Sequence, residues 1–116
     1  MSALPPPFAS LGVVLITASS EAEADRLARH LVDQRLAACV SITPIKSVYR
    51  WQGEVNVEPE WQLTVKTDLG RFDAIAQAIT QLHSYAVPEI IALPIVAGLP
   101  DYLTWLQAQV QELPMA

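Results

Sequence analysis

The feature that most constrains the fold of this chain is a β-rich segment between residues 37 and 67. In both halves of this segment, apolar and polar side chains alternate with the period of two that is typical of a β-strand. The alternating apolar positions are Val40, Ile42, Trp61, Leu63 and Val65. Gln52-Gly53 lies between the halves and suits the tight turn of a hairpin. The segment therefore predicts one long β-hairpin.

The predicted hairpin carries more apolar side chains than a domain of this size can cover with its own core. Those near its tip are Val48, Tyr49, Trp51, Val55 and Val57. Hydrophobic residues make up 52% of the 116 residues and charged residues only 16%, whereas a typical soluble domain has about 25% charged residues. Pro44 and Pro59 cannot donate to a strand ladder, so we expect them at bulges or sheet edges. The exposed apolar hairpin predicts contacts between subunits.

A buried strand and an amphipathic helix are predicted ahead of the hairpin. Residues 11–17 form a short, nearly continuous apolar run, which is typical of a buried strand. Ser20, with Glu23 three residues later, is a capping-box signature for the start of a helix. Apolar residues then recur at helical spacing until about Gln34.

Two more helices and another strand are predicted after the hairpin. A helix capped by Thr67 or Asp68 ends before Pro88, residues 90–96 form a buried strand, and a last helix begins at Pro100. The order is βαββαβ followed by a helix. This order predicts an α+β fold, a ferredoxin-like sandwich with its helices on one face of the sheet.

The domain organisation follows from these elements and from the chain length. We expect a flexible arm at residues 1–10, a single domain at residues 11–111 and a short tail at residues 112–116. No apolar run reaches the roughly 20 residues of a transmembrane helix, and no positive segment precedes the first one. The single cysteine, Cys39, excludes an intrachain disulfide. We therefore expect a cytoplasmic protein without a transmembrane segment.

Several classes of function are disfavoured by the sequence. The formal net charge is −5 and the basic residues are scattered, which argues against a nucleic-acid partner. The four glycines are isolated, so no phosphate-binding loop or dinucleotide fingerprint is present. One cysteine and two histidines are too few for a closed structural zinc site within one chain. We find no catalytic motif, and therefore expect a non-enzymatic protein without an organic cofactor.

The segment from residue 83 to 90 concentrates the side chains that could carry chemistry. His83 and Glu89 offer nitrogen and oxygen ligands to a divalent cation, and Cys39 adds a thiolate if the fold brings it near. The alternative is that His83 and Glu89 cap backbone groups while Tyr85 packs at the turn. Glu89 precedes an apolar run, where a carboxylate usually needs a partner, and Lys66 is one candidate.

Aromatic residues of the hairpin also have two interpretations. Tyr49, Trp51 and Trp61 could line a ligand cleft, or they could form part of the apolar contact between subunits. The second interpretation agrees with the general enrichment of aromatic side chains in interfaces. Cys39 lies within an apolar strand and is most simply a small buried side chain, because no oxyanion site or third orienting group marks it as a nucleophile.

Five blocks of the sequence together resemble the CutA family of divalent-cation tolerance proteins. They are Ala37-Ala38-Cys39-Val40-Ser41-Ile42, the stretch from Ser47 to Gly53, Lys66-Thr67, the stretch from His83 to Ile90, and Tyr102-Leu103-x-Trp105-Leu106. The resemblance extends over residues 11–111. It implies a ferredoxin-like subunit in a tight homotrimer, in which the long hairpins pair across subunits. It also implies kinship with PII-like trimeric signalling proteins, whose effectors bind in clefts between subunits.

Two functions follow from the resemblance as expectations. The first is binding of, and tolerance to, divalent metal ions, with Cu(II) the favoured ion and Cys39, His83 and Glu89 as the metal-side residues. Ile16 stands where some members have a cysteine, and a site that relied on that thiolate would be weakened. The second is PII-like binding of a small-molecule effector. The residues expected to line its cleft are Tyr49, Trp51, Lys66, Tyr85 and Glu89. A purely structural trimer that presents a surface to a partner protein is a third interpretation.

Overall fold

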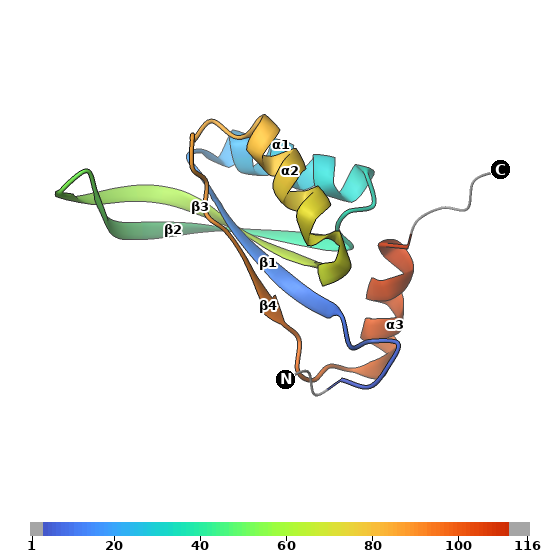
Figure 1. The fold of residues 1–116 in the computed structure, drawn as a ribbon. Coiled ribbons are helices and arrows are strands. Elements are labelled where there is room, and N and C mark those ends of the chain that lie inside the picture. The colour runs from blue at the N-terminus through green and yellow to red at the C-terminus, as the bar shows by residue number, and fades with distance from the viewer. Residues whose placement is uncertain (1–3, 112–116) are drawn as a thin grey trace.

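The computed structural model describes residues 4–111 and contains a four-stranded antiparallel sheet with the strand order β2-β3-β1-β4. Along the chain the elements are β1 (Leu11–Ala18), α1 (Glu21–Asp33), β2 (Cys39–Trp51), β3 (Glu54–Asp68), a single 3-10 turn (Leu69–Arg71), α2 (Phe72–Leu82), β4 (Ile90–Pro94) and α3 (Pro100–Gln109) (Figure 1). The predicted order of elements and the ferredoxin-like fold class are confirmed.

The main core lies between the sheet and the two helices α1 and α2, which cover one of its faces (Figure 1). Val14 and Ile16 of β1 pair with Val65 and Leu63 of β3, so their side chains share this face and are fully buried. The helices contribute Leu27, Leu31, Ile75 and Ile79, also fully buried.

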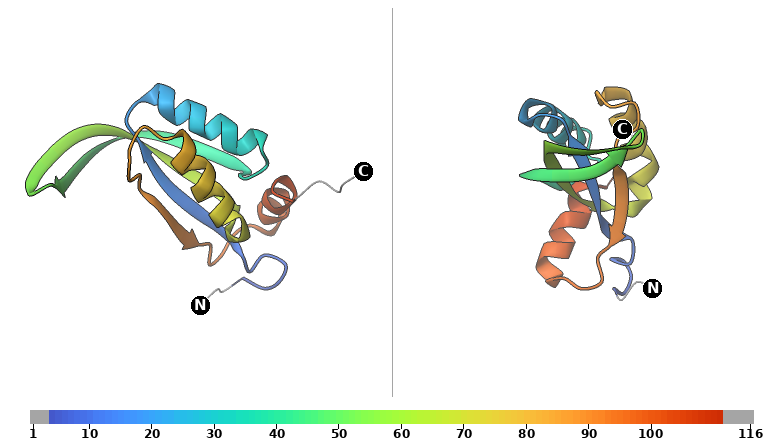
Figure 2. Two further views of the ribbon diagram at one scale, coloured as in Figure 1. Left: turned by 45° about the horizontal axis from the view of Figure 1, so that its top comes forward. Right: turned by 90° about the vertical axis from the view of Figure 1, so that its left-hand side faces the viewer.

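Helix α3 does not join that layer, contrary to the prediction that all helices cover one face. It lies away from α1 and α2, at the other side of the sheet (Figure 2). There Leu103 and Leu106 pack around Leu11, at the start of β1, in a second small core. Because strand side chains alternate, Leu11 points to the face opposite Val14 and Ile16. The sequence pattern showed that α3 has an apolar stripe but not which face of the sheet receives it.

The start of α2 also differs from the expectation. The strand β3 continues through Thr67 to Asp68, and the Asp68 carboxylate caps the 3-10 turn by accepting from the Gly70 N–H at 2.8 Å. Thr67 is fully buried and donates its hydroxyl to the Leu36 carbonyl at 2.7 Å. Asp68 therefore serves the connection before α2, whereas Thr67 ties the end of β3 to the loop after α1, and α2 itself begins at Phe72 without a side-chain cap.

The β2–β3 hairpin keeps an unbroken register from Cys39 opposite Lys66 to Trp51 opposite Glu54. Its turn has positive φ at both central residues, 51° at Gln52 and 81° at Gly53, which is the conformation of a type I′ turn. The predicted turn is confirmed. Since β1 pairs with β3 only from residue 61 onward, the outer part of the hairpin extends beyond the rest of the sheet (Figures 1 and 2).

Both prolines of the hairpin lie at unpaired edges rather than at bulges. Pro44 is in β2, the outermost strand of the sheet, and Pro59 lies in the part of β3 that β1 does not reach. The missing N–H of each proline therefore breaks no inner ladder.

The projecting part of the hairpin is apolar on both of its faces. Val48 and Val57 are cross-strand partners on one face and are 64% and 55% exposed. Tyr49 and Trp51 point to the other face and are 38% and 54% exposed. At the opposite edge of the sheet, Ile91 of β4 is exposed as well. A single subunit thus leaves two apolar surfaces uncovered, as the sequence predicted for the hairpin.

Residues 4–10, expected as part of a flexible arm, lie against the domain. Phe8 and Leu4 pack on the small core around Leu11, and the Ser10 carbonyl accepts a hydrogen bond from the Leu69 N–H at 2.7 Å. This part of the arm is therefore packed. Residues 1–3 of the arm and the predicted tail at residues 112–116 lie outside the described residues.

Candidate functional site: an aromatic and acidic cleft

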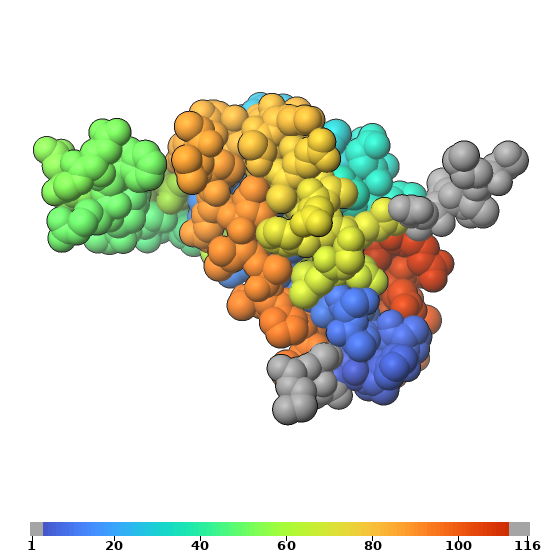
Figure 3. Space-filling view, in the orientation of Figure 1, coloured from blue at the N-terminus to red at the C-terminus, as the bar shows by residue number. Residues whose placement is uncertain are grey.

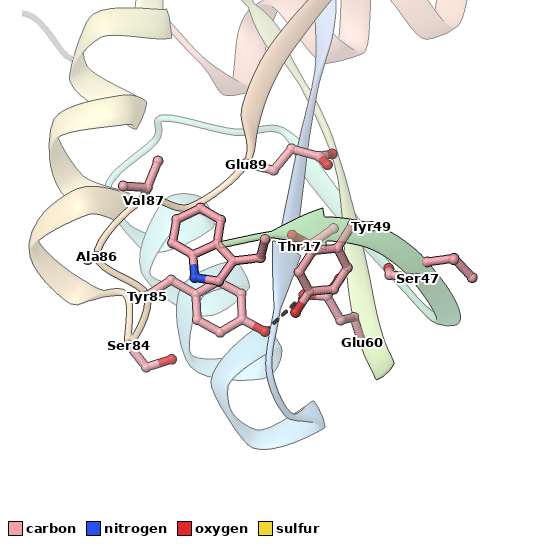
Figure 4. Close-up of a pocket in the computed structure, with 11 residues that line it drawn as sticks. Thr17, Ser47, Tyr49, Glu60, Ser84, Tyr85, Ala86, Val87 and Glu89 are labelled. Carbon is pink, nitrogen blue, oxygen red and sulfur yellow. Dashed lines mark hydrogen bonds between the residues drawn. The ribbon is translucent and has the colours of Figure 1, made fainter. Parts of the chain in front are cut away.

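A cleft of about 710 Å³ lies between the hairpin and the loop that joins α2 to β4 (Figure 4). Its lining residues come from β1, β2, β3 and the loop, and are Thr17, Ser47, Val48, Tyr49, Trp51, Glu60, Ser84, Tyr85, Ala86, Val87 and Glu89. Figure 3 shows the hairpin (green) standing clear of the body of the subunit. The cleft forms where this projection leaves the body.

Four of the five residues expected to line a ligand cleft are brought together here: Tyr49, Trp51, Tyr85 and Glu89. Lys66 lies elsewhere. Its ammonium group donates to the Ser41 hydroxyl at 2.9 Å, and it forms no ion pair with Glu89 among the described residues. The chain thus gathers the aromatic and acidic members of the predicted set without the basic one.

Glu60 is the polar centre of the cleft, although the sequence pattern does not predict it as a site residue. The Tyr85 hydroxyl donates to Glu60 Oε2 at 2.9 Å, and Figure 4 shows Tyr49 beside this pair. Glu60 is only 7% exposed. Its alternation with Gln62 and Thr64 is typical of a solvated strand face, so the sequence contains no signal that a distant loop covers it.

Both tyrosines remain neutral phenols over the physiological pH range. Burial, followed by the hydrogen bond to Glu60, raises the pKa of Tyr85 far above its ordinary value. Burial, followed by Glu58 and Glu60, raises the pKa of Tyr49. Each hydroxyl therefore keeps its proton as a hydrogen-bond donor.

His83 has a structural role in the loop beside the cleft. Its side chain is fully buried. Its Nδ1 accepts from the Tyr85 N–H at 3.0 Å, and its Nε2 lies 2.7 Å from the Thr17 carbonyl oxygen. An N–H can only donate and a carbonyl can only accept, so the ring is the neutral tautomer with its proton on Nε2. Both nitrogens are occupied, which matches the backbone-capping interpretation of this residue.

Glu23 anchors the same loop and was expected only to cap a helix. As the capping box predicts, Ser20 Oγ accepts from the Glu23 N–H at 3.0 Å. The Glu23 carboxylate, however, accepts from the Ser19 N–H at 3.0 Å and from the Ser84 N–H at 2.8 Å. Burial alone would raise its pKa, but these hydrogen bonds from Ser19 and Ser84 outweigh it and lower the pKa from 4.5 to about 2. Glu23 thus links the loop between α2 and β4, which forms one wall of the cleft, to the start of α1.

The three expected metal-side residues do not come together within one subunit. Among residues 4–111, no three histidine, cysteine, aspartate or glutamate side chains form a group that could hold a metal ion. Cys39 is half-buried at the start of β2, opposite Lys66, whereas Glu89 is exposed at the cleft. Ile16, at the position of the extra cysteine of some relatives, is fully buried in the main core. The assignment of these metal ligands stays a prediction.

Comparison with known proteins identifies the family. The family model described as "CutA1 divalent ion tolerance protein" matches residues 12–109. The chain belongs to the CutA family. The CutA relative from Thermus thermophilus, named divalent-cation tolerance protein, is 51% identical over 96 residues, which cover 82% of this chain and 93% of that protein. The relative of the same name from Archaeoglobus fulgidus is 40% identical over 98 residues and covers 84% and 96% of the two chains.

Solved CutA structures share the fold of this chain. The structure from Archaeoglobus fulgidus, described as a periplasmic divalent cation tolerance protein, has a TM-score of 0.85 at 39% identity and covers 87% of this chain and 99% of that one. The CutA1 structure from Oryza sativa also has a TM-score of 0.85, at 41% identity, and covers 88% and 94%. Within residues 4–111 of this CutA chain, no helix is long and apolar enough to cross a membrane.

Proposed function

We propose that this CutA-family chain is a non-enzymatic, homotrimeric binding protein that acts in tolerance to divalent metal ions. The observation that carries the proposal is its 51% identity to a protein named for divalent-cation tolerance, over nearly the whole length of that protein. The lack of a catalytic motif supports the non-enzymatic part of the proposal.

The trimer is supported by the two apolar surfaces that one subunit leaves uncovered. The hairpin is apolar on both faces, and β4 forms a free sheet edge with Ile91 exposed. The projecting hairpin of one subunit can pair with the free edge strand of the next subunit. Repeated around a rotation axis, this contact closes a ring. In such an assembly the cleft beside the hairpin lies next to a neighbouring subunit.

Copper is the metal that we propose, because Cu(II) binds nitrogen, oxygen and sulfur ligands most tightly among the first-row divalent ions. Glu89 has an exposed carboxylate, and Cys39 is half-buried with a free thiol. His83 would have to give up its bond to the Thr17 carbonyl before it could ligate. A site with these residues therefore requires ligands from more than one subunit.

Titration of metal-free protein with Cu(II), followed by calorimetry, tests the proposed ligands. We expect Glu89→Gln to weaken binding by about tenfold or more, since one charged ligand is lost, and Cys39→Ser to have a similar effect. Glu54→Gln is the control, because it removes an equal charge at the exposed hairpin tip. Unchanged affinity in Glu89→Gln, Cys39→Ser and His83→Ala would remove these residues from the site.

A second function, binding of a small-molecule effector in the cleft, is favoured by the cleft itself. A cavity of about 710 Å³ lies in the size range of small-molecule sites and is lined by the aromatic residues Tyr49, Trp51 and Tyr85. We expect a thermal-shift screen of metabolites to find a compound that raises the unfolding temperature, and Trp51→Ala to abolish the shift. If tight metal binding is found and no metabolite stabilises the protein, the effector function is excluded in favour of the metal function.

We also propose a cytoplasmic location, on the ground that the chain has a single cysteine and so cannot form an intrachain disulfide. Cell fractionation tests it. Recovery of the protein with the soluble cytoplasmic fraction is the expected result, and recovery from an extracytoplasmic compartment would contradict it.

A further inference from the structure

The charge of the cleft is of one sign only. Two carboxylates line it, from Glu60 and Glu89, together with three aromatic rings, and no lysine, arginine or histidine is among the lining residues within the described part of the chain. Lys66, the basic residue that was expected to line the cleft, is bonded to Ser41 instead. The charge that this subunit contributes to the cleft is therefore negative, and the apolar walls limit its screening by solvent.

The buried carboxylate of Glu60 has unused bonding capacity. The Tyr85 hydroxyl occupies Oε2, and among residues 4–111 no hydrogen bond reaches Oε1. The Glu60 residue is 7% exposed, and its free Oε1 keeps contact with solvent, so a cation in the cleft can reach this oxygen. Glu89 offers a second carboxylate at the rim and is exposed.

The remaining lining favours a cation that also has apolar substituents. The faces of aromatic rings attract cations, and an ammonium group near several rings gains from each. Tyr49, Trp51 and Tyr85 supply the rings, while Val48 and Val87 add aliphatic surface. A hydrated inorganic ion prefers a shell of oxygen ligands and uses neither rings nor aliphatic groups.

We propose that this cleft binds an organic cation, a substituted ammonium group that lies against the three rings and is paired with the carboxylates of Glu60 and Glu89. The proposal rests on the effector function stated above and gives the chemical class of the effector. Nucleotides and organic acids are disfavoured, because their negative charge would face two carboxylates with no basic residue of this subunit to offset them.

Three probes separate the charge of the ligand from its shape. Choline carries a trimethylammonium group, its carbon isostere carries a neutral tert-butyl group of nearly the same shape, and ATP is an anion. Calorimetric titration of the intact purified protein is expected to show choline binding at least tenfold more tightly than the neutral isostere. We expect no binding of ATP, and weaker choline binding at high salt.

Substitutions in the cleft locate the binding. We expect Glu60→Gln and Glu89→Gln each to weaken choline about fivefold or more while leaving the neutral isostere unaffected, and Trp51→Ala to weaken both. Glu89 makes no hydrogen bond within the described residues, so its substitution tests the charge without disturbing the fold. Glu54→Gln, which removes the same charge outside the cleft, should leave choline affinity unchanged.

The outcomes distinguish this proposal from the effector function on which it rests. Equal affinity for choline and the neutral isostere, or Trp51-dependent binding of ATP, overturns the organic-cation class but leaves a small-molecule cleft. If none of the three probes binds, the organic-cation class is overturned. If, in addition, no metabolite stabilises the protein in the thermal-shift screen, the effector function is excluded as well.

Discussion

Replacing Val57 by lysine is expected to dissociate the assembly into monomers. Val57 is 55% exposed in the single subunit, so a lysine there costs an isolated subunit little. In the proposed trimer the same side chain is covered by a neighbouring copy. An unpaired charge buried in such an interface costs about 3 to 5 kcal/mol, and a closed trimer contains the change in every subunit.

Light scattering coupled to size-exclusion chromatography measures this effect, and Val32→Lys is the matched control. Val32 is 44% exposed on α1, away from the hairpin and the β4 edge, and lies in the last turn of the helix, where a positive charge is favourable. We expect Val32→Lys to keep the mass of the wild-type assembly. A Val57→Lys protein of unchanged mass and thermal stability would show that the hairpin is not an interface.

The second large effect is expected from Glu23→Gln, which should lower the free energy of unfolding by about 3 kcal/mol at pH 7. This estimate converts the lowering of the Glu23 pKa from 4.5 to about 2 into stability. The amide can accept from one of the N–H groups of Ser19 and Ser84, but its NH₂ group faces the other and leaves that donor unsatisfied. Arg26 lies 3.8 Å from the carboxylate in a weak, largely exposed ion pair, and the neutral His83 ring, 3.9 Å away, adds no charge.

The stabilising effect of the Glu23 carboxylate is expected to depend on pH. Because the pKa of Glu23 is lower in the folded protein than in the unfolded chain, its contribution is complete above about pH 5 and is lost as the pH falls toward 2. Urea unfolding at constant protein concentration should therefore show wild type and Glu23→Gln converging in acid. Glu21→Gln, an exposed residue in the same first turn, is the control. A constant difference between pH 7 and pH 2 would contradict the assigned role of the carboxylate.

Most of the fold could be predicted because its determinants are local. The Gln52-Gly53 turn, the Ser20 cap and the alternating strands all follow from residues close in sequence. The position of α3 could not be predicted, since its apolar stripe fits either face of the sheet and only the contact with Leu11 decides between them. The continuation of β3 to Asp68 was missed because the Asp68 side chain caps a 3-10 turn in the way it would cap a helix.

The candidate site could be predicted in part. The aromatic residues and Glu89 stand out by type, and four of the expected lining residues do share a cleft. Glu60 and Glu23 were missed as members of the site because their partners, Tyr85 and Ser84, lie 25 and 61 residues away along the chain. His83 shows the reverse: its residue type is that of a metal ligand, but two backbone groups take up both ring nitrogens.

Native mass spectrometry of the purified protein tests most directly the central claim that the apolar hairpin is covered by copies of the same chain. The account predicts a single species at three times the 12.7 kDa subunit mass, with any ligand of the cleft retained as a defined added mass. A stable, soluble monomer at 12.7 kDa would contradict it, because the exposed valines of the hairpin would then have no partner.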